Sequence, residues 1–265
     1  MLFLRHFPVV LGVSKFEPSD CQSVDNDVYT CDRRAKKDAS PLKALYLEAG
    51  FGLAFTKPTG TGSDSYVSDP TKPVPYIPRP MRLNDADRWR PWLVTDQRSV
   101  ADRTDVLTYE TPVLTSPVRV SGAPIADLLA QTTGTDADWV VKLIDVYPDE
   151  VPSQMELGGY ELAVAMDIFR WRYRDSFEHP AAIPSGKTQE YKFTLPTVNH
   201  VFEPGHRIMV QIQSSWFPLY DRNPQKFVEN IFNAKPGDYT KATQTVMRSA
   251  AEASAVWLPV VGDVK

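Results

Sequence analysis

The chain has 265 residues, 42% of them hydrophobic, enough for one large all-β domain or two smaller domains with a substantial core. Its formal net charge of −4 lacks the basic field that binds nucleic acid, so we expect no nucleic-acid partner. No stretch approaches the about 18 apolar residues of a membrane span, so we expect no membrane partner. The 23 prolines against 13 glycines predict many short strands and rigid turns.

The first segment, residues 1–40, differs in composition from the remainder and is predicted to be irregular. Its apolar start is interrupted by Arg5 and His6 and lacks the unbroken apolar core of an export signal. Cys21 and Cys31 enclose a short polar loop, which suits either one disulfide or two free thiols. Since no histidine lies nearby at ligand spacing, we expect no zinc site there.

A proline-rich segment, residues 56–92, follows the first predicted strand at 44–49. Prolines recur from Pro70 to Pro80 and favour an extended, polyproline-like backbone. Four aromatic side chains are interleaved with this segment, namely Tyr66, Tyr76, Trp89 and Trp92. Because a free linker does not need that much aromatic area, we predict a strap that lies over a protein surface.

From residue 106 onward, short apolar runs follow one another with turn residues between them. The main runs are 106–109, 117–120, 138–147, 162–168, 191–195, 207–213, 243–247 and 255–260. The run 138–147 is nearly continuously apolar, which predicts a strand buried on both faces. The total of about eight or nine strands, with no convincing long helix, indicates an all-β sandwich or jelly roll.

Two of these strands carry an alternating pattern. One face of 162–168 collects four apolar side chains, Leu162, Val164, Met166 and Ile168, which favours a strand over a short helix. In 207–213 the apolar residues alternate with Gln211 and Gln213, the pattern of a half-buried strand. This second strand leads into residues 213–224, the segment that we expect the rest of the chain to hold in place as a contact surface.

That segment, residues 213–224, places large aromatic and charged side chains among prolines that prevent it from staying in a sheet. Its candidate contact residues are Trp216, Phe217, Tyr220, Asp221 and Arg222. Such side chains at a strand end either fill a hydrophobic groove or face another domain.

The chain carries no complete catalytic set. A hydrolase of the α/β type needs its serine in a Gly-x-Ser-x-Gly elbow, which does not occur, and Ser63 is read as a linker serine. His200 and His206 flank the turn before a strand and have no third ligand, so we predict a structural role for them. We therefore predict no catalytic residue, no metal site and no cofactor within this chain.

Charged residues gather at two further places. Asp136 and Asp138 either act as acid and base in a cleft or are solvated turn residues, which is the more common case. Arg170, Arg172 and Arg174 alternate and would line one face of a strand. We interpret them as a solvated face or as a charged patch for a partner domain or a carboxylate.

Four strings carry a family resemblance: Tyr66–Tyr76, Asp138–Glu150, Pro204–Ile208 and Gln213–Pro224. Over roughly residues 41–262 the chain resembles the C-terminal part of the α-amino-acid ester hydrolases. That group includes cocaine-esterase-like, glutaryl-acylase-like and X-prolyl-dipeptidyl-peptidase-like serine hydrolases. The resemblance implies a jelly-roll β-sandwich of the galactose-binding-like kind over residues 41–265, with residues 1–40 fitting poorly.

In that family an α/β-hydrolase domain carries the catalytic triad and precedes the jelly roll, so no catalytic residue is carried over to this chain. The resemblance implies a non-catalytic C-terminal domain of a serine hydrolase acting on α-amino-acid esters or amides, or on X-Pro peptides. Such a domain walls the acyl pocket and supports assembly into oligomers. Trp216, Phe217, Tyr220 and Arg222 would then face the catalytic domain or the substrate mouth, and a periplasmic or secreted location is expected.

Two other interpretations stay open at this point. A stand-alone carbohydrate-binding jelly roll would use Trp216 and Tyr220 as a platform on which sugar rings stack. An inactive fragment of a disrupted hydrolase gene is the other, and the poor fit of residues 1–40 favours it.

Overall fold

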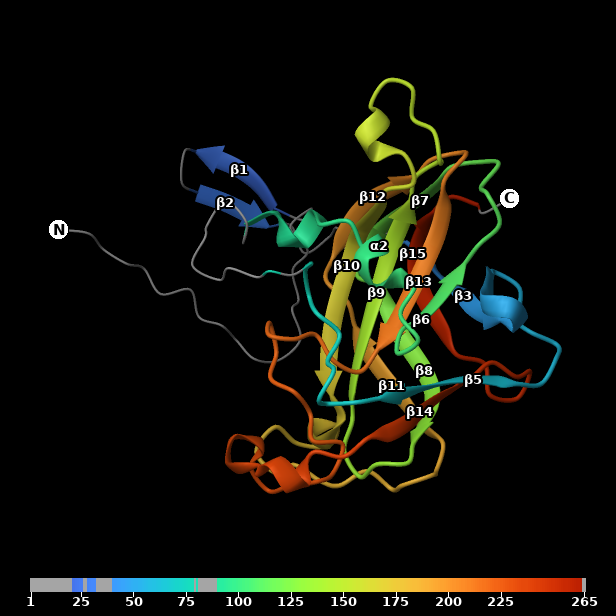
Figure 1. The fold of residues 1–265 in the computed structure, drawn as a ribbon. Coiled ribbons are helices and arrows are strands. Elements are labelled where there is room, and N and C mark those ends of the chain that lie inside the picture. Colours follow the sequence, from blue (N-terminus) through green and yellow to red (C-terminus); the bar gives the residue numbers. More distant parts are fainter. Residues whose placement is uncertain (1–20, 26–27, 32–39, 79, 81–89, 264–265) are drawn as a thin grey trace. The chain divides into compact units, whose positions relative to one another are not determined.

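The computed structural model describes residues 21–25, 28–31, 40–78, 80 and 90–263 (Figure 1). The chain divides into two compact units, Met1–Ser40 and Pro41–Lys265. In the first unit, β1 (Cys21–Asp25) and β2 (Val28–Cys31) pair antiparallel, with Cys21 opposite Cys31. This part of the segment predicted to be irregular is therefore a hairpin. The apolar start, Arg5 and His6, and Trp89 of the strap lie outside the described residues.

The second unit is built from strands joined by short loops. Its strands are β3 (Leu42–Glu48), β4 (Gly52–Ala54), β5 (Ser63–Ser68), β6 (Leu107–Glu110), β7 (Val118–Gly122), β8 (Ile125–Thr132), β9 (Asp138–Val146), β10 (Glu161–Arg170), β11 (Gln189–Thr194), β12 (Val198–Phe202), β13 (Arg207–Gln213), β14 (Ala242–Met247) and β15 (Ala255–Val261). The helical turns are η3 (Ala49–Phe51), η4 (Arg90–Val94), α2 (Arg98–Ala101), η5 (Met155–Leu157), η6 (Trp171–Tyr173), η7 (Ile231–Asn233) and η8 (Pro236–Asp238). None of the described helices is long and apolar enough to span a membrane.

Among the described strands of this unit, the pairing forms one continuous antiparallel ladder with one parallel pair, Gly52 of β4 opposite Glu110 of β6. Its order is β10-β9-β13-β6-β4-β3-β15-β8-β14-β5, with β11 on β8, and β12 on β7, which in turn pairs with β15. The ladder folds over a shared core, and this confirms the predicted all-β, jelly-roll-like sandwich (Figure 1).

Strand β9 is buried along its whole length, which confirms the prediction from its continuous apolar run. Trp139, Val141 and Leu143 face the main core between the layers. Val140 and Lys142 face the opposite side, which we call the outer face, and both are also fully buried. A second layer must therefore cover the outer face.

The outer face of the neighbouring strands differs from the sequence prediction in two ways. Gln211 and Gln213 of β13 are completely buried, so this strand is not half-exposed. In β10 the register shifts between Ala163 and Ala165, which breaks the alternation of the four apolar residues. As a result Val164 packs on the main core, while Met166 and Ile168 lie on the outer face.

Three segments form this covering layer: residues 74–77 of the strap, residues 92–101, which begin where the strap ends, and residues 214–223, which come much later in the chain. The strap runs parallel to the third segment through a bridge between Pro75 and Phe217. The Tyr76 amide donates to the Phe217 carbonyl at 3.0 Å, and the Phe217 amide donates to the Val74 carbonyl at 2.9 Å. The proline-rich strap thus lies against the segment that follows β13.

Candidate functional site

The segment 213–224 leaves β13 and crosses the outer face of the sheet. Buried Ser214 forms a 2.6 Å hydrogen bond with the Tyr66 hydroxyl, and the Ser215 hydroxyl accepts from the Val74 amide at 2.9 Å. Both serines follow directly on the strand, so they fix the direction in which the segment departs. Ser214 and Ser215, the two small residues of the string Gln213–Pro224, therefore have a local structural role.

An aromatic cluster of Tyr76, Trp92, Trp216 and Tyr220 forms the centre of the covering layer. The Trp92 ring meets the Trp216 ring edge-on at 5.6 Å, and the Tyr220 ring stacks on Trp216 at 6.0 Å and 12°. Trp216 is 3% exposed and packs against Val140 of β9. It cannot present its ring to a partner and instead supports Tyr220, which is 40% exposed.

The other three candidate contact residues fall into two groups. Asp221 is exposed and lies 3.1 Å from Arg170. The Arg222 guanidinium lies 5.7 Å from the Phe217 ring centre and 5.1 Å from the ring centre of Tyr239, and it donates to the Pro70 carbonyl. Arg222 and Phe217 thus join the strap to the segment, whereas Tyr220 and Asp221 stay accessible.

Two further exposed residues were missed from the sequence. Leu93 and Val94, at the end of η4, are 56% and 52% exposed and follow directly on Trp92 of the aromatic cluster. We call Leu93, Val94 and Tyr220 the outer apolar surface. The sequence signal was present in the apolar pair after Trp92, but only the fold shows that this pair leaves the core while Trp92 packs into it.

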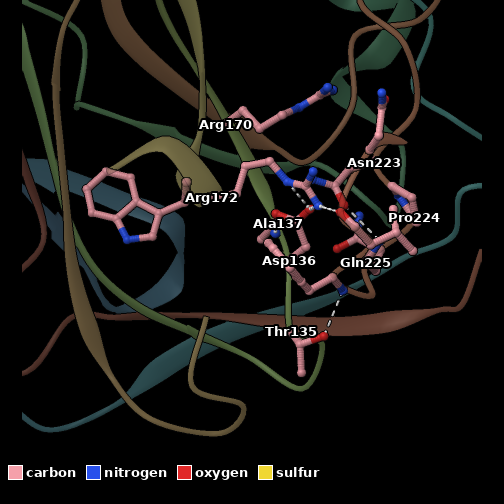
Figure 2. A network of polar contacts seen from close by, with 12 residues as sticks. Thr135, Asp136, Ala137, Arg170, Arg172, Asn223, Pro224 and Gln225 are labelled. Atoms are coloured by element: carbon pink, nitrogen blue, oxygen red, sulfur yellow. Dashed lines mark hydrogen bonds and ion pairs between the residues drawn. The ribbon is translucent and has the colours of Figure 1, made fainter. Parts of the chain in front are cut away.

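Beside this surface, buried ion pairs hold the segment 221–228 to the sheet. Asp136 and Arg172 lie 2.8 Å apart and are 0% and 1% exposed, and Asp138 and Arg170 lie 2.8 Å apart. Figure 2 shows the Arg172 guanidinium directed at Asp136, with the turn around Gln225 next to it. The expectation of solvated turn acids and a solvated arginine face is wrong, because these charges neutralise one another inside the domain.

The fold explains this pairing. Strand β10 ends at Arg170, so Arg172 falls in the η6 turn and does not continue the alternation of a strand. Arg172 also donates to the Val228 carbonyl at 2.6 Å, and its guanidinium lies 4.7 Å from the centre of the Phe227 ring. Asn223 donates to Asp138 at 2.8 Å. Burial raises the pKa of Asp136, and the Arg172 charge opposes that shift.

The turn at Gln225 is fixed by a close backbone approach. Gln225 adopts a left-handed φ of 62° and is 2% exposed. Its side chain donates to Ser68 and accepts from Gln244, while its carbonyl accepts from the Thr135 amide. A Cβ atom at Gly134 would lie 2.2 Å from the Gln225 carbonyl oxygen. Gly134 is therefore required by the close approach of these two chain segments.

We expect Gly134→Ala to destabilise the domain by about 3 kcal/mol, because backbone atoms must move to admit the new methyl group. Urea unfolding followed by tryptophan fluorescence measures this change. Gly60→Ala is the matched control, since nothing lies within 4 Å of a Cβ atom at that position. Equal unfolding midpoints for the two variants would contradict the assigned contact.

The two histidines on either side of the turn between β12 and β13 share one carboxylate. Asp145 of β9 is 1% exposed and lies 2.8 Å from His206 Nδ1 and 2.8 Å from His200 Nε2. Because His200 belongs to β12 and His206 precedes β13, the carboxylate ties three strands together. Among the described residues, no group of three or more histidine, cysteine, aspartate or glutamate side chains could hold a metal ion.

A buried lysine joins the covering layer to the sheet. Lys142 Nζ donates to the Gln97 side chain at 2.8 Å and to Gln211 at 3.4 Å, and Gln211 in turn donates to Glu161. Burial lowers the pKa of Lys142 to about 7 and raises the pKa of Glu161 to about 7. In the folded state Lys142 is therefore uncharged above about pH 7, whereas Glu161 is uncharged below about pH 7.

These shifts predict a minimum of stability near pH 7. Between the ordinary pKa of Glu161, 4.5, and its folded value of about 7, the folded state binds more protons, so stability falls as pH rises. Between about 7 and 10.5 the unfolded state binds more protons at Lys142, so stability rises with pH. We expect Lys142→Met to remove the alkaline rise in urea midpoint. A constant difference between wild type and variant from pH 7 to 10 would contradict it.

The described unit is thus a jelly-roll-like sandwich with an apolar surface on its outer face. Residues 34–256 match the family model of the X-Pro dipeptidyl-peptidase C-terminal non-catalytic domain. The chain belongs to that family, and this confirms the resemblance seen in the sequence strings.

Relatives of known structure agree with this assignment. An α-amino acid ester hydrolase has 55% identity and a TM-score of 0.82 over 83% of the chain. An aminopeptidase from a marine sediment Thaumarchaeota archaeon has 52% identity and a TM-score of 0.80, also over 83% of the chain. Among curated proteins, the cocaine esterase of Rhodococcus sp. (strain MB1 Bresler) is 40% identical over 181 residues, 68% of the chain.

These relatives are much longer than the match. The chain spans 36% of the ester hydrolase, 36% of the aminopeptidase and 29% of the cocaine esterase. It corresponds to about a third of each, which is consistent with a separate, non-catalytic domain joined to a catalytic part.

Proposed function

We propose that this chain is the C-terminal domain of a serine hydrolase that acts on α-amino-acid esters or amides, or on X-Pro peptides. Its partner is an α/β-hydrolase catalytic domain. It docks on that domain through the outer apolar surface and Asp221, walls the acyl pocket and supports assembly into oligomers.

The observation that carries this proposal is the 55% identity with an α-amino acid ester hydrolase of which the chain matches about a third. The geometry supports it. Leu93 and Val94 are more than half exposed beside the stacked pair of Trp216 and Tyr220. Exposed apolar side chains on a rigid base are typical of the buried centre of an interface. The carbohydrate-platform interpretation loses one of its two rings, because Trp216 is buried.

A domain exchange tests the proposal. In the α-amino acid ester hydrolase, the matching C-terminal part is replaced by residues 41–265 of this chain, and the hydrolysis of an α-amino-acid ester is compared with that of the enzyme lacking this part. We expect the chimera to retain activity within about tenfold and the shortened enzyme to lose it. A folded chimera as inactive as the shortened enzyme would overturn the proposal.

The chain by itself provides the second arm of the test. We expect the purified chain to turn over p-nitrophenyl esters no faster than buffer. Turnover that survives purification and is abolished by a serine-reactive phosphonate would show a catalytic serine within the chain and contradict the non-catalytic role.

A further inference from the structure

The two exposed residues at the end of η4 lie in a short loop that is fixed at both ends. We call residues 92–97 the η4 loop. Trp92, directly before Leu93 and Val94, packs in the aromatic cluster. Gln97, three residues after Val94, is polar and yet 3% exposed. The position of the outer apolar surface therefore depends on how this loop is held against the sheet.

The Gln97 side chain joins the η4 loop to the centre of the sheet. Its Oε1 atom accepts from Lys142 Nζ of β9 at 2.8 Å, and its Nε2 atom donates to the Thr95 carbonyl at 2.6 Å. A carbonyl can only accept, so Nε2 must face Thr95 and Oε1 must face Lys142. One side chain thus connects the backbone directly after Val94 to a fully buried residue of the central strand.

Other contacts of the η4 loop are easier to replace. The Tyr160 hydroxyl donates to the Val94 carbonyl at an exposed position, and the Gln97 amide donates to the Glu161 carbonyl at 3.1 Å. Water can take the place of an exposed partner, whereas a buried group that loses its partner stays unpaired. Since Lys142 is 0% exposed, water cannot replace the Gln97 side chain that it contacts.

We infer that Gln97 is a positioning residue for docking, which holds the η4 loop in the one conformation in which Leu93 and Val94 meet the catalytic domain. The inference rests on the proposed function and deepens it by naming the buried link that shapes the contact surface. A loop that is ordered before association loses little conformational entropy on binding, so the link raises affinity without touching the partner. Lys142 is the fixed point of this link and acts only through Gln97.

The test measures docking on the chimera after a protease has cut the linker between its two parts, with the dissociation constant determined by dilution. Gln97→Leu removes both side-chain hydrogen bonds and should raise the dissociation constant at least about tenfold. Combining it with Lys142→Met leaves no unpaired buried lysine, so stability recovers, but the loop still lacks its link. We expect this double variant to dock as weakly as Gln97→Leu, within about threefold, and it decides the question even if Gln97→Leu alone does not fold.

Gln211→Leu is the matched control. Gln211 of β13 is also fully buried and also accepts from Lys142, at 3.4 Å, but it lies in the sheet and not in the η4 loop. We expect this change to lower the urea midpoint of the isolated chain and to leave the dissociation constant within about threefold of wild type. Hydrogen exchange of the η4 loop amides in the isolated chain should accelerate for Gln97→Leu and stay unchanged for Gln211→Leu.

The outcomes separate the two proposals. If the wild-type parts bind and Gln97→Leu binds equally well, the inference is overturned while the docking role stands. The same holds if adding Lys142→Met restores the docking of Gln97→Leu, or if Gln211→Leu weakens docking as much, because Gln97 then only stabilises the fold. If the cut wild-type parts do not bind at any concentration, the docking role fails and the inference fails with it.

Discussion

Replacing Arg172 by methionine is expected to destabilise the domain by about 3–5 kcal/mol, the typical cost of leaving one partner of a buried ion pair alone. Arg172 is 1% exposed and Asp136 is 0% exposed, so water cannot replace the lost guanidinium. The substitution also removes the hydrogen bond to Val228 and the contact with Phe227. Globular proteins have free energies of unfolding of about 5–15 kcal/mol, so this loss is a large fraction of the total stability.

The remaining Asp136 carboxyl determines how this loss depends on pH. Without Arg172, burial and the neighbouring charge of Asp138 are opposed much less, so the folded-state pKa of Asp136 rises further above its ordinary value of 3.8. The folded variant then binds a proton that the unfolded chain releases, and its stability falls as pH rises through the acidic range. We therefore expect Arg172→Met to be less damaging at pH 5 than at pH 8 when urea midpoints are compared.

A double variant shows whether the pair itself is responsible. Asp136→Leu combined with Arg172→Met leaves no isolated charge, so it should be less destabilised than the sum of the single variants, by about 2 kcal/mol. Strict additivity of the two single changes would contradict the assigned ion pair.

The sequence predicted those parts of the fold that depend on local pattern. The unbroken apolar run of 138–147 indicated a strand buried on both faces, and β9 has that burial. The proline-rich strap and the aromatic segment after β13 were also foreseen, because proline geometry and clustered aromatic side chains leave a direct trace in composition.

What the sequence could not show depends on contacts between distant segments. Arg170 and Arg172 read as a solvated face until Asp138 and Asp136, more than thirty residues earlier, are placed beside them. Likewise Gln211 and Gln213 read as solvent-facing because polar residues on alternate positions usually are. Their burial follows from the covering layer, whose segments come from the strap region and from the segment after β13, far apart in the chain.

The same argument explains why the candidate site was only partly predicted. Composition identified the aromatic residues of 213–224, but the depth of each side chain depends on what packs above it. Trp216 lies under Trp92 and Tyr220 and supports them, while Leu93 and Val94 take over part of the exposed apolar area. The outer apolar surface thus comes from two segments about 130 residues apart, which no single string reveals.

Replacing Leu93 and Val94 by serine is expected to weaken docking on the catalytic domain by at least about tenfold. Full burial of an apolar side chain of this size contributes about 1.5–3 kcal/mol, and 1.4 kcal/mol corresponds to a factor of ten in an equilibrium constant. In the isolated chain both side chains are more than half exposed, so the double variant should unfold within about 0.5 kcal/mol of wild type.

The loss is measured on the chimera with a protease site placed in the linker between its two parts: the linker is cut after assembly, and the dissociation constant of the two parts is determined by dilution. Met155→Ser supplies the matched control. Met155 is 85% exposed in the η5 turn and has the same apolar character, but it is not part of the outer apolar surface. Equal weakening by the two changes would mean that general surface hydrophobicity, and not this surface, holds the parts together. If only Leu93→Ser/Val94→Ser weakens docking and the stability of the isolated chain is unchanged, the contact lies on η4. A folding defect would have lowered both the docking affinity and the stability of the isolated chain.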